Sequence, residues 1–407
     1  MPKAPRAKPP QKQNDPDLAF VGGVVIDPEK LISERARCVD VSGIRRAFQL
    51  GASLENPIDL SIGQPDFGVP EPLVRAAVDA IEQGRNGYTL TGGAEDLRAS
   101  VAAHLRRNVD WTIGGGQSDL LITSGTSGAL LLAFMALCEQ GCEAIVPDPY
   151  FVVYPALGPM TGPKIVLCDT YGDFRMTAER VEPLITERTR VVLLNTPANP
   201  TGVVLSDSEI SDLVDLCADR GVMLVSDEIY DLFTFSDGCG AAGRCPSPAR
   251  FTKDMLLIRG FGKTYGCTGW RLGYAAGPPW LIEQMAKFQQ YSFVCAPSMS
   301  QAGVVGAFDV DMSDIVERFE RRRNLVRETF EDVTNISDSR GAFYALVEVP
   351  PSLGMSGTEF CDLAVKHDVV IIPGGVFSER DTHVRISFAC EDEQLAKGLR
   401  VLRGLME

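Results

Sequence analysis

The chain has few histidines and no closely paired cysteines, and both shortages argue against a metal site. Only His104, His367 and His383 occur among 407 residues, and none lies near another histidine in the sequence. The 11 cysteines are scattered without a Cys-x-x-Cys pair, and even Cys138 and Cys142 are separated by three residues. Structural zinc sites draw their ligands from closer pairs. An odd number of scattered thiols instead predicts reduced cysteines in a cytoplasmic protein.

Positive charge and long apolar segments are also scarce. There are 39 Lys and Arg residues against 54 Asp and Glu residues, a formal net charge of −15. Nucleic acids and anionic membranes need a basic face, so we expect neither as a partner. The apolar run 18–26 is too short to cross a bilayer and lacks the small-residue cleavage site of a signal peptide. No Gly-x-Gly-x-x-Gly turn opens a first strand–helix unit, which argues against a nucleotide-binding dehydrogenase.

What remains is the composition of an ordinary globular protein with room for two domains. Hydrophobic residues make up 45% and charged residues 23% of the chain. The first residues are different, because four cations lie among prolines and no acidic residue precedes Asp15. This pattern predicts a flexible basic tail over residues 1–27.

The middle of the chain repeats one rhythm, in which a short apolar run ends in polar or glycine-rich residues and an amphipathic stretch follows. Such runs are typical of strands buried on both faces, and their alternation with helices predicts a mostly parallel sheet. Ligands of open α/β sheets bind outside the carboxyl ends of the strands. We therefore expect the polar residues after these runs to converge on one edge of the sheet. The expected strands are 120–123, 144–146, 191–194, 222–225 and 256–258.

The last hundred residues have a different pattern, which predicts an α+β segment. Strands are expected at 342–349, 369–372 and 384–388, and a closing helix at 395–405. Residues 315–330 form a charged helix pattern with five arginines. Such a run of charge is typical of a solvated helix face.

Five side chains of the middle region carry the chemistry of a cofactor site. Lys263 lies among glycines and aromatics. Close packing would desolvate its amine and make it a usable nucleophile and base, although most single lysines are solvated surface charges. Asp227 either caps a helix or presents a carboxylate to a pyridinium nitrogen. With the phenol of Tyr230, the amide of Asn199 and the guanidinium of Arg271, these groups suit pyridoxal phosphate, whose protonated ring is an electron sink.

Three further features fit the same hypothesis, each with a plainer alternative. The segment 124–128 is glycine-rich and precedes a helix pattern, so it is either a simple turn or an anion site at a helix N-terminus. Phe151 follows a strand and is either core or a flat surface for a ring. Arg385 lies within a strand pattern, where it either faces solvent or clamps a carboxylate through two hydrogen bonds.

Taken together, these motifs resemble the fold-type I pyridoxal-phosphate aminotransferases of class I, the aspartate aminotransferase family. The resemblance runs from about Ser42 to the C-terminus. Its most specific segments are 226–230 (Ser-Asp-Glu-Ile-Tyr) and 268–274 (Thr-Gly-Trp-Arg-Leu-Gly-Tyr). Segments 42–46 and 62–67 are similar to the subgroup that contains many bacterial and archaeal aspartate and aromatic aminotransferases.

The resemblance implies an α/β fold with two domains. A large pyridoxal-phosphate domain, residues 68–305, would contain a mostly parallel seven-stranded sheet flanked by helices. A smaller α+β domain would comprise residues 306–407, joined by the N-terminal segment 28–67.

The resemblance also implies a role for each residue that faces the ring of the cofactor. Lys263 would bind pyridoxal phosphate covalently and then move a proton on the substrate. Asp227 would pair with the pyridinium nitrogen, Tyr230 and Asn199 would bond the ring hydroxyl, and Phe151 would stack on the ring.

Other residues would hold the cofactor phosphate and the substrate. The implied phosphate ligands are Gly125, Thr126, Ser127 and Arg271, and the implied ligands of the substrate carboxylate are Gly63, Asn199 and Arg385. Tyr88 would reach the phosphate of a neighbouring subunit, so a homodimer with shared active sites is implied.

The implied activity is ping-pong transfer of an amino group from an L-amino acid to a 2-oxo acid. Two departures bear on it. Gly260 stands three residues before Lys263, where many members have a phosphate-binding serine, and residues 126–128 lack the lysine with which some acidic-substrate members meet a distal carboxylate. A strong preference for aspartate is therefore not expected. The alternatives are a β-eliminating C–S lyase on the same fold, which would use the same lysine, and a non-catalytic regulator, which would need a fused nucleic-acid-binding module.

Overall fold

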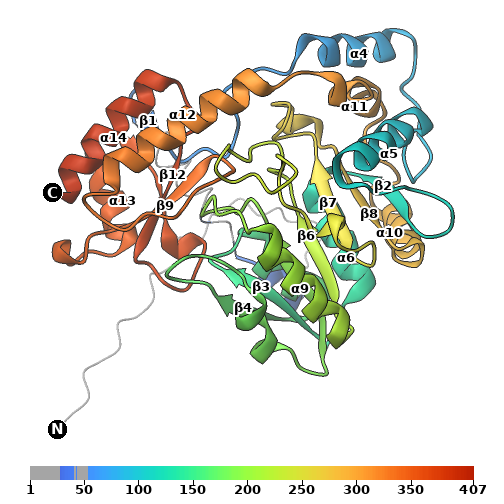
Figure 1. Cartoon of the computed structure of the whole chain (residues 1–407), viewed down its shortest axis with the longest axis horizontal. Helices are drawn as coiled ribbons and strands as arrows, with labels where there is room; N and C mark the ends of the chain where they lie inside the picture. Colours follow the sequence, from blue (N-terminus) through green and yellow to red (C-terminus); the bar gives the residue numbers. More distant parts are fainter. Residues whose placement is uncertain (1–27, 41–42, 44–53) are drawn as a thin grey trace, which may run out of the picture. The chain divides into compact units, whose positions relative to one another are not determined.

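The computed structural model describes residues 28–40, 43 and 54–407 (Figure 1). The expected tail 1–27 and positions 42 and 44–46 of the family-like segment lie outside the described residues. The described residues up to Val39 belong to a unit of their own, with two short helices, α1 (Pro28–Leu31) and α2 (Glu34–Arg37). Ser33 caps α2 by accepting a hydrogen bond from the backbone N–H of Ala36. The three sheets described next belong to the second unit, residues 40–407.

A seven-stranded sheet has the order β2-β8-β7-β6-β5-β3-β4, in which β8 is antiparallel to both neighbours and the other pairs are parallel. The expected mostly parallel seven-stranded sheet is confirmed. All five expected strands occur, and β4 and β8 complete the sheet. The strands are β2 (Asp119–Thr123), β3 (Glu143–Asp148), β4 (Lys164–Asp169), β5 (Thr189–Asn195), β6 (Met223–Asp227), β7 (Leu256–Gly260) and β8 (Gly273–Gly277).

Helices cover both faces of this sheet. Successive side chains of a strand point to opposite faces, so the apolar side chains of each strand are buried by helices on both sides. On β5, Val192 and Leu194 pack into the core that includes α5 (Glu95–Val109) and α9 (Asp207–Arg220). Val191 and Leu193 pack into the opposite core. Its helices are α6 (Gly125–Leu137), α7 (Val153–Thr161) and α10 (Pro279–Ser292). The remaining helices of this region are α4 (Glu71–Glu82), α8 (Ala178–Val181) and α11 (Ser298–Gly303).

A smaller antiparallel sheet has the order β11-β12-β9 and lies beside a short parallel pair, β1-β10. The expectation of one strand over 369–372 is wrong, since β10 pairs with β1 whereas β11 pairs with β12. Both pieces are buried, so a continuous apolar run conceals the change of partner at Ile371. The elements are β1 (Ile58–Asp59), β9 (Tyr344–Glu348), β10 (Val369–Val370), β11 (Ile372–Pro373), β12 (His383–Ser387), α12 (Ser313–Phe330), α13 (Gly357–Val365) and α14 (Asp392–Met406).

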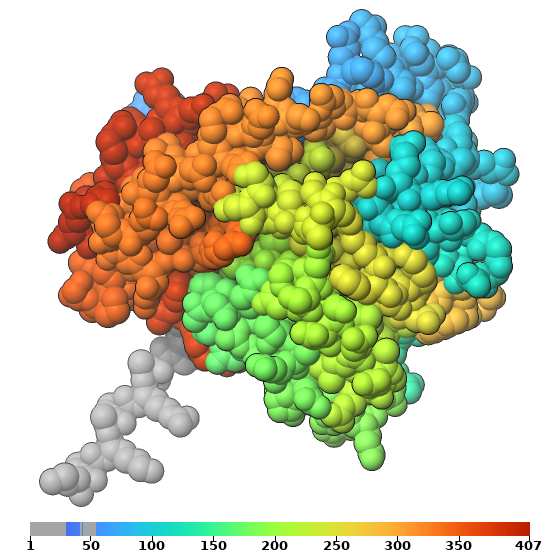
Figure 2. Space-filling view, in the orientation of Figure 1, coloured from blue at the N-terminus to red at the C-terminus, as the bar shows by residue number. Residues whose placement is uncertain are grey.

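Helix α12 runs alongside α14, orange beside red in Figure 2. The expectation of a solvated charged face is wrong for two of its arginines, because Arg322 and Arg323 are only 4% and 5% exposed. Arg322 pairs with Asp66 at 2.9 Å and with Asp392 at 2.5 Å, and Arg323 pairs with Asp237 at 3.1 Å. A run of charge does not reveal partners that are distant in sequence. The expected domain boundaries at residues 67 and 305 stay predictions.

Candidate active site

A cavity of about 430 Å³ lies where the strands of the large sheet end. Its walls come from the segments after β2, β3, β5, β6 and β7, and from β9 and β12 of the smaller sheet. Tyr88 is 86% exposed and lies outside this wall. The other predicted site residues all line the cavity: Gly63, Gly125, Thr126, Ser127, Phe151, Asn199, Asp227, Tyr230, Lys263, Arg271 and Arg385.

Lys263 lies in the turn that follows β7. Its Nζ donates a hydrogen bond to the carbonyl oxygen of Gly63 and lies 5.8 Å from the centroid of the Phe343 ring. Burial lowers the pKa of Lys263 to about 8, and the cations Arg385 and Arg271 contribute to the same shift. The neutral fraction of this amine near neutral pH is therefore much larger than that of an exposed lysine, and only the neutral amine is a nucleophile or base.

Asp227 is the last residue of β6, and no helix of the described residues starts there, so the capping alternative does not apply. Tyr154 on α7 donates a hydrogen bond of 2.9 Å to Oδ2, and the backbone N–H of Ile229 donates one of 3.3 Å to Oδ1. Burial raises the pKa of Asp227 to about 6, although both hydrogen bonds oppose this rise. A buried carboxylate of this kind gains most from a cationic partner.

Arg385 is 1% exposed, which excludes the solvent-facing alternative. Its Nη1 donates to Oδ1 of Asn199 at 3.0 Å, and its Nη2 donates to the carbonyl oxygen of Ser61 at 2.7 Å. The guanidinium lies between two aromatic rings, 4.3 Å from the centroid of Tyr344 and 4.7 Å from that of Phe377. Its Nε is buried and bonds to none of the described residues. A fixed cation with a spare donor is suited to a carboxylate.

The first turn of α6 faces Arg271. No side chain caps this helix at Ser124, so its leading backbone N–H groups remain available to an anion. Gly125 has a φ of +72°, and a Cβ there would lie 2.8 Å from Nη2 of Arg271. A glycine at this position thus lets the guanidinium approach the helix N-terminus. Together they form an anion cradle, a site that is suited to bind a phosphate.

The structure gives a reason for the glycine at position 260. A Cβ on Gly260 would lie 2.8 Å from Cδ1 of Ile229 and 3.0 Å from Cγ2 of Thr126. A serine at this position would require the end of the Ile229 side chain to move and would press on Thr126. The anion cradle of this chain is therefore formed without a side chain at residue 260.

The cavity residues that sequence reasoning misses include Tyr154, Asn195 and Tyr344. Asn195 ends β5, so the rule that ligands bind at strand ends could have found it. Its Oδ1 accepts from the backbone N–H of Asn199 at 2.8 Å, and its Nδ2 donates to the carbonyl oxygen of Asp227 at 2.9 Å. Tyr154 and Tyr344 carry no comparable signal, because their positions depend on how separate elements pack.

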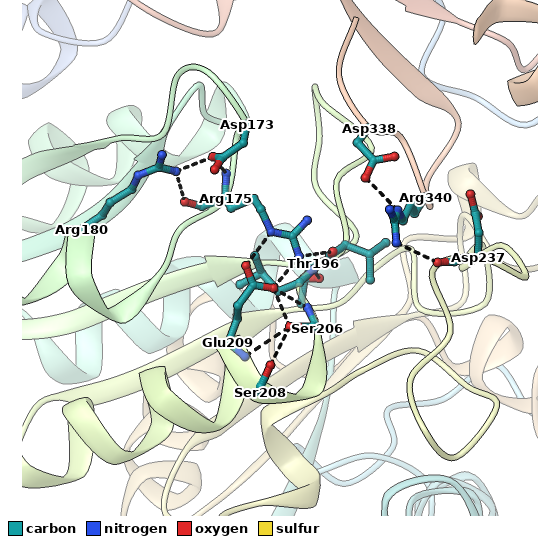
Figure 3. Close-up of polar contacts among 12 residues, drawn as sticks. Asp173, Arg175, Arg180, Thr196, Ser206, Ser208, Glu209, Asp237, Asp338 and Arg340 are labelled. Carbon is teal, nitrogen blue, oxygen red and sulfur yellow. Dashed lines mark hydrogen bonds and ion pairs between the residues drawn. The ribbon is translucent and has the colours of Figure 1, made fainter. Parts of the chain in front are cut away.

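The side chains of Arg175 and Glu209 hold the loop that carries Asn199, residues 196–206, in place (Figure 3). Arg175 donates through Nη2 to the carbonyl oxygen of Val204 at 3.1 Å and through Nε to Oε1 of Glu209 at 2.5 Å. Glu209 also forms a capping box with Ser206 at the start of α9. Against the effect of burial, these hydrogen bonds hold the pKa of Glu209 at about 2. The same contacts fix the chain on which Asn199 lies.

Among the residues that the structure describes, no three His, Cys, Asp or Glu side chains converge in a way that could hold a metal ion. No helix of this part of the chain is both long and apolar enough to cross a membrane. All 11 cysteines are described, and all carry free thiols.

Known proteins are similar to this chain over most of its length. Residues 55–402 match the model of the family "Aminotransferase class I and II". The chain is 33% identical to a probable aspartate aminotransferase of Methanocaldococcus jannaschii, over 93% of this chain and 100% of that protein. It is 32% identical to aromatic-amino-acid aminotransferase 2 of Thermococcus litoralis, over 90% and 96% of the two chains. The solved aspartate aminotransferase of Thermotoga maritima is 30% identical and has a TM-score of 0.84, over 92% of this chain and 99% of that one. The expected family is therefore confirmed: the chain belongs to the class I and II aminotransferases and is a transaminase of fold type I.

Proposed function

We propose that this aminotransferase holds pyridoxal phosphate in the cavity and moves an amino group from an L-amino acid to a 2-oxo acid. When bound, this cofactor supplies an aldehyde that condenses with amines and a cationic ring that accepts electrons from the substrate Cα. One observation carries the proposal. A lysine with a pKa of about 8, a buried carboxylate and a buried arginine with a spare donor line the same cavity.

The lining residues fit the parts of this cofactor. The uncapped turn of α6 and Arg271 match a phosphate, and buried Asp227 matches a cationic ring nitrogen. Phe151 lines the wall, its ring centroid 5.7 Å from that of Tyr154 and nearly perpendicular to it, and a flat side chain in the wall is suited to stack on a ring. Tyr230 and Asn199 are the phenol and amide for a ring hydroxyl. The backbone and hydroxyl donors for the phosphate are Gly125, Thr126 and Ser127.

Lys263, Arg385 and Gly63 each have a separate role in the proposed reaction. With the cofactor bound, neutral Lys263 would be the amine that condenses with its aldehyde and releases water, and the same amine, once freed by a substrate amine, would take the α-proton and hand it back. Arg385 orients the substrate carboxylate, since its Nε lacks a partner among the described residues while Asn199 and Ser61 hold its other nitrogens. Gly63 places its carbonyl oxygen against the lysine amine.

We also propose a homodimer in the cytoplasm. Within residues 54–407, four large apolar or aromatic side chains are more than half exposed: Tyr88 at 86%, Leu90 at 67%, Trp280 at 54% and Tyr291 at 89%. A second copy that covered them would bury this surface, and Tyr88 would then reach the partner's phosphate site. Eleven free thiols favour a reducing compartment. Sedimentation that shows a fully active monomer would refute the shared site.

Two experiments test the proposed chemistry. Borohydride reduction of the cofactor-loaded protein, followed by peptide mapping, should label Lys263 alone, and a label on another lysine would contradict the assignment. A panel of amino donors with 2-oxoglutarate as acceptor should show amino transfer. The relatives named above favour including aspartate and aromatic amino acids. Pyruvate and ammonia released without transfer would point to elimination instead.

A further inference from the structure

Tyr344 contacts residues on both the cofactor side and the substrate side of the cavity. It is 1% exposed and lines the cavity wall from β9. Its phenol oxygen lies 3.1 Å from that of Tyr230, and the centroid of its ring lies 4.3 Å from the guanidinium carbon of Arg385. One side chain thus touches two residues to which the proposed function gives separate tasks.

The sheet register explains this double contact. In the antiparallel pair of β9 and β12, Tyr344 lies opposite Ser387, and Arg385 is two residues further along the same face of β12. Diagonal neighbours at this spacing are within reach of aromatic and long side chains. Phe377 covers the other face of the guanidinium, at 4.7 Å from its carbon. Both rings hold Arg385 in one plane through cation–π contacts.

The hydrogen bond between the two phenols can run in either direction, and Tyr344 decides which phenol donates it. Burial raises the pKa of Tyr230 and the pKa of Tyr344, so both keep their protons. A phenol has one proton to donate. If Tyr230 donates into the cavity, its oxygen is left to accept, and Tyr344 is the neighbour that can donate to it. Gly63 leaves room for this hydroxyl, because a Cβ there would lie 2.7 Å from the Tyr344 oxygen.

We propose that Tyr344 is a positioning residue that acts through both Tyr230 and Arg385. Its hydroxyl directs the proton of Tyr230 towards the ring oxygen of the cofactor, and its ring holds the guanidinium in the plane that the substrate carboxylate meets. The inference rests on the proposed function, since it assigns these two neighbours to cofactor and substrate.

Two variants separate the hydroxyl from the ring. Tyr344→Phe keeps the ring under Arg385 and removes the donor to Tyr230. The visible absorbance of its bound pyridoxal phosphate should then titrate at a pH higher by about half a unit or more, because the ring oxygen loses part of a hydrogen bond. Its Kd for 3-phenylpropionate, a carboxylate without an amino group, should stay within about twofold of the unaltered value. Calorimetry gives this Kd without any turnover.

Tyr344→Leu removes both contacts. It should raise the titration midpoint in the same way and also weaken 3-phenylpropionate binding by about fivefold or more, which is the size of a lost cation–π contact. Tyr344→Met replaces this variant if the leucine protein does not fold. The matched control is Tyr171→Phe, which removes a phenol outside the cavity wall and should change neither reading.

The outcomes are distinct. An unchanged midpoint in Tyr344→Phe, or unchanged carboxylate binding in the variant without the ring, would overturn the inference while leaving the proposed function in place. Equal weakening of carboxylate binding in Tyr344→Phe and Tyr344→Leu would also overturn it, because the ring would then have no separate role. If the unaltered protein takes up no pyridoxal phosphate, the proposed function fails and the inference fails with it.

Discussion

The phenol of Tyr154 donates a hydrogen bond of 2.9 Å to Oδ2 of Asp227. Tyr154 is fully buried, and burial raises its pKa well above the usual value, so it remains the donor. This bond stabilises the charged form of Asp227 against the burial that raises its pKa. The site depends on that charge, because a neutral carboxyl could not hold a ring nitrogen in its cationic form.

The first prediction concerns this bond. Tyr154→Phe removes the donor, so the pKa of Asp227 should rise further. The acid limb of the pH profile of kcat should move to higher pH, and kcat near pH 7 should fall about tenfold, as expected for a hydrogen bond to a charged group. Profiles of the two proteins between pH 5 and 8 give the comparison. The phenyl ring keeps its packing against Phe151, so a loss of cofactor with an unmoved acid limb would contradict this explanation.

The second prediction concerns the pH dependence of cofactor attachment. Only neutral Lys263 can attack an aldehyde, and its pKa is lowered from 10.5 to about 8. With the cofactor removed, the rate of attachment should rise with pH and reach half its maximum near pH 8. Stopped-flow absorbance at a fixed concentration of pyridoxal phosphate measures this rate. Arg385→Gln removes one of the two cations that lower the pKa, so its midpoint should be higher.

Two results would count against that assignment. A midpoint near 10.5 would mean that the amine is not desolvated in solution. Visible absorbance of normal strength in Lys263→Ala would mean that another amine forms the bond. A protein that binds the cofactor only weakly and without this absorbance is the expected result for Lys263→Ala.

Much of the site can be predicted from the sequence because each apolar run marks its own strand. Once the runs before Asn199, Asp227 and Lys263 are taken as parallel strands, their ends must meet at one edge. The order of the strands carries no such local mark. Strand β8 inserts antiparallel between β2 and β7, and its residues Gly-Tyr-Ala-Ala-Gly have little strand propensity.

Contacts between separate elements are the part that the sequence does not reveal. Tyr154 reaches Asp227 from α7, and Tyr344 reaches Tyr230 and Arg385 from the smaller sheet. Tyr154 lies within a helix and Tyr344 within a strand of the smaller sheet, so neither stands directly at the end of a strand of the large sheet, where the rule finds the others. Only the packing of helix on sheet, and of one sheet beside the other, brings these phenols to the cavity.

The third prediction concerns a buried ion pair next to the site. Arg259 is 1% exposed and donates to Oε2 of Glu228 through Nε at 3.0 Å and Nη2 at 2.8 Å, while its Nη1 lies 3.0 Å from Asp231. Arg259→Met would leave Glu228, which directly follows Asp227, as a buried charge without its cation. The cost should be about 3–5 kcal/mol of unfolding free energy. Denaturant unfolding measures it.

A double variant and a surface control sharpen this test. Adding Glu228→Gln to Arg259→Met removes the unpaired charge and should restore part of the loss. Arg327→Met breaks an exposed pair with Glu331, in which both side chains are more than half exposed, and should change stability little. Equal losses in Arg259→Met and Arg327→Met would mean that burial of the ion pair is not what matters.

The last prediction concerns the choice of amino donor. Among the described residues of the cavity wall, the cations are Lys263, Arg271 and Arg385, and the proposed function uses all three. Arg385→Lys should therefore weaken all donors alike, because lysine cannot reproduce the paired hydrogen bonds of a guanidinium. No fourth cation of this wall remains for the distal carboxylate of aspartate. We expect kcat/KM for neutral or aromatic donors to lie within about a thousandfold of that for aspartate, a difference of roughly 4 kcal/mol. Side-by-side kcat/KM values decide the matter, and a larger preference for aspartate would show that a cation other than these three, such as Arg45 or a residue of a second copy, reads the distal carboxylate.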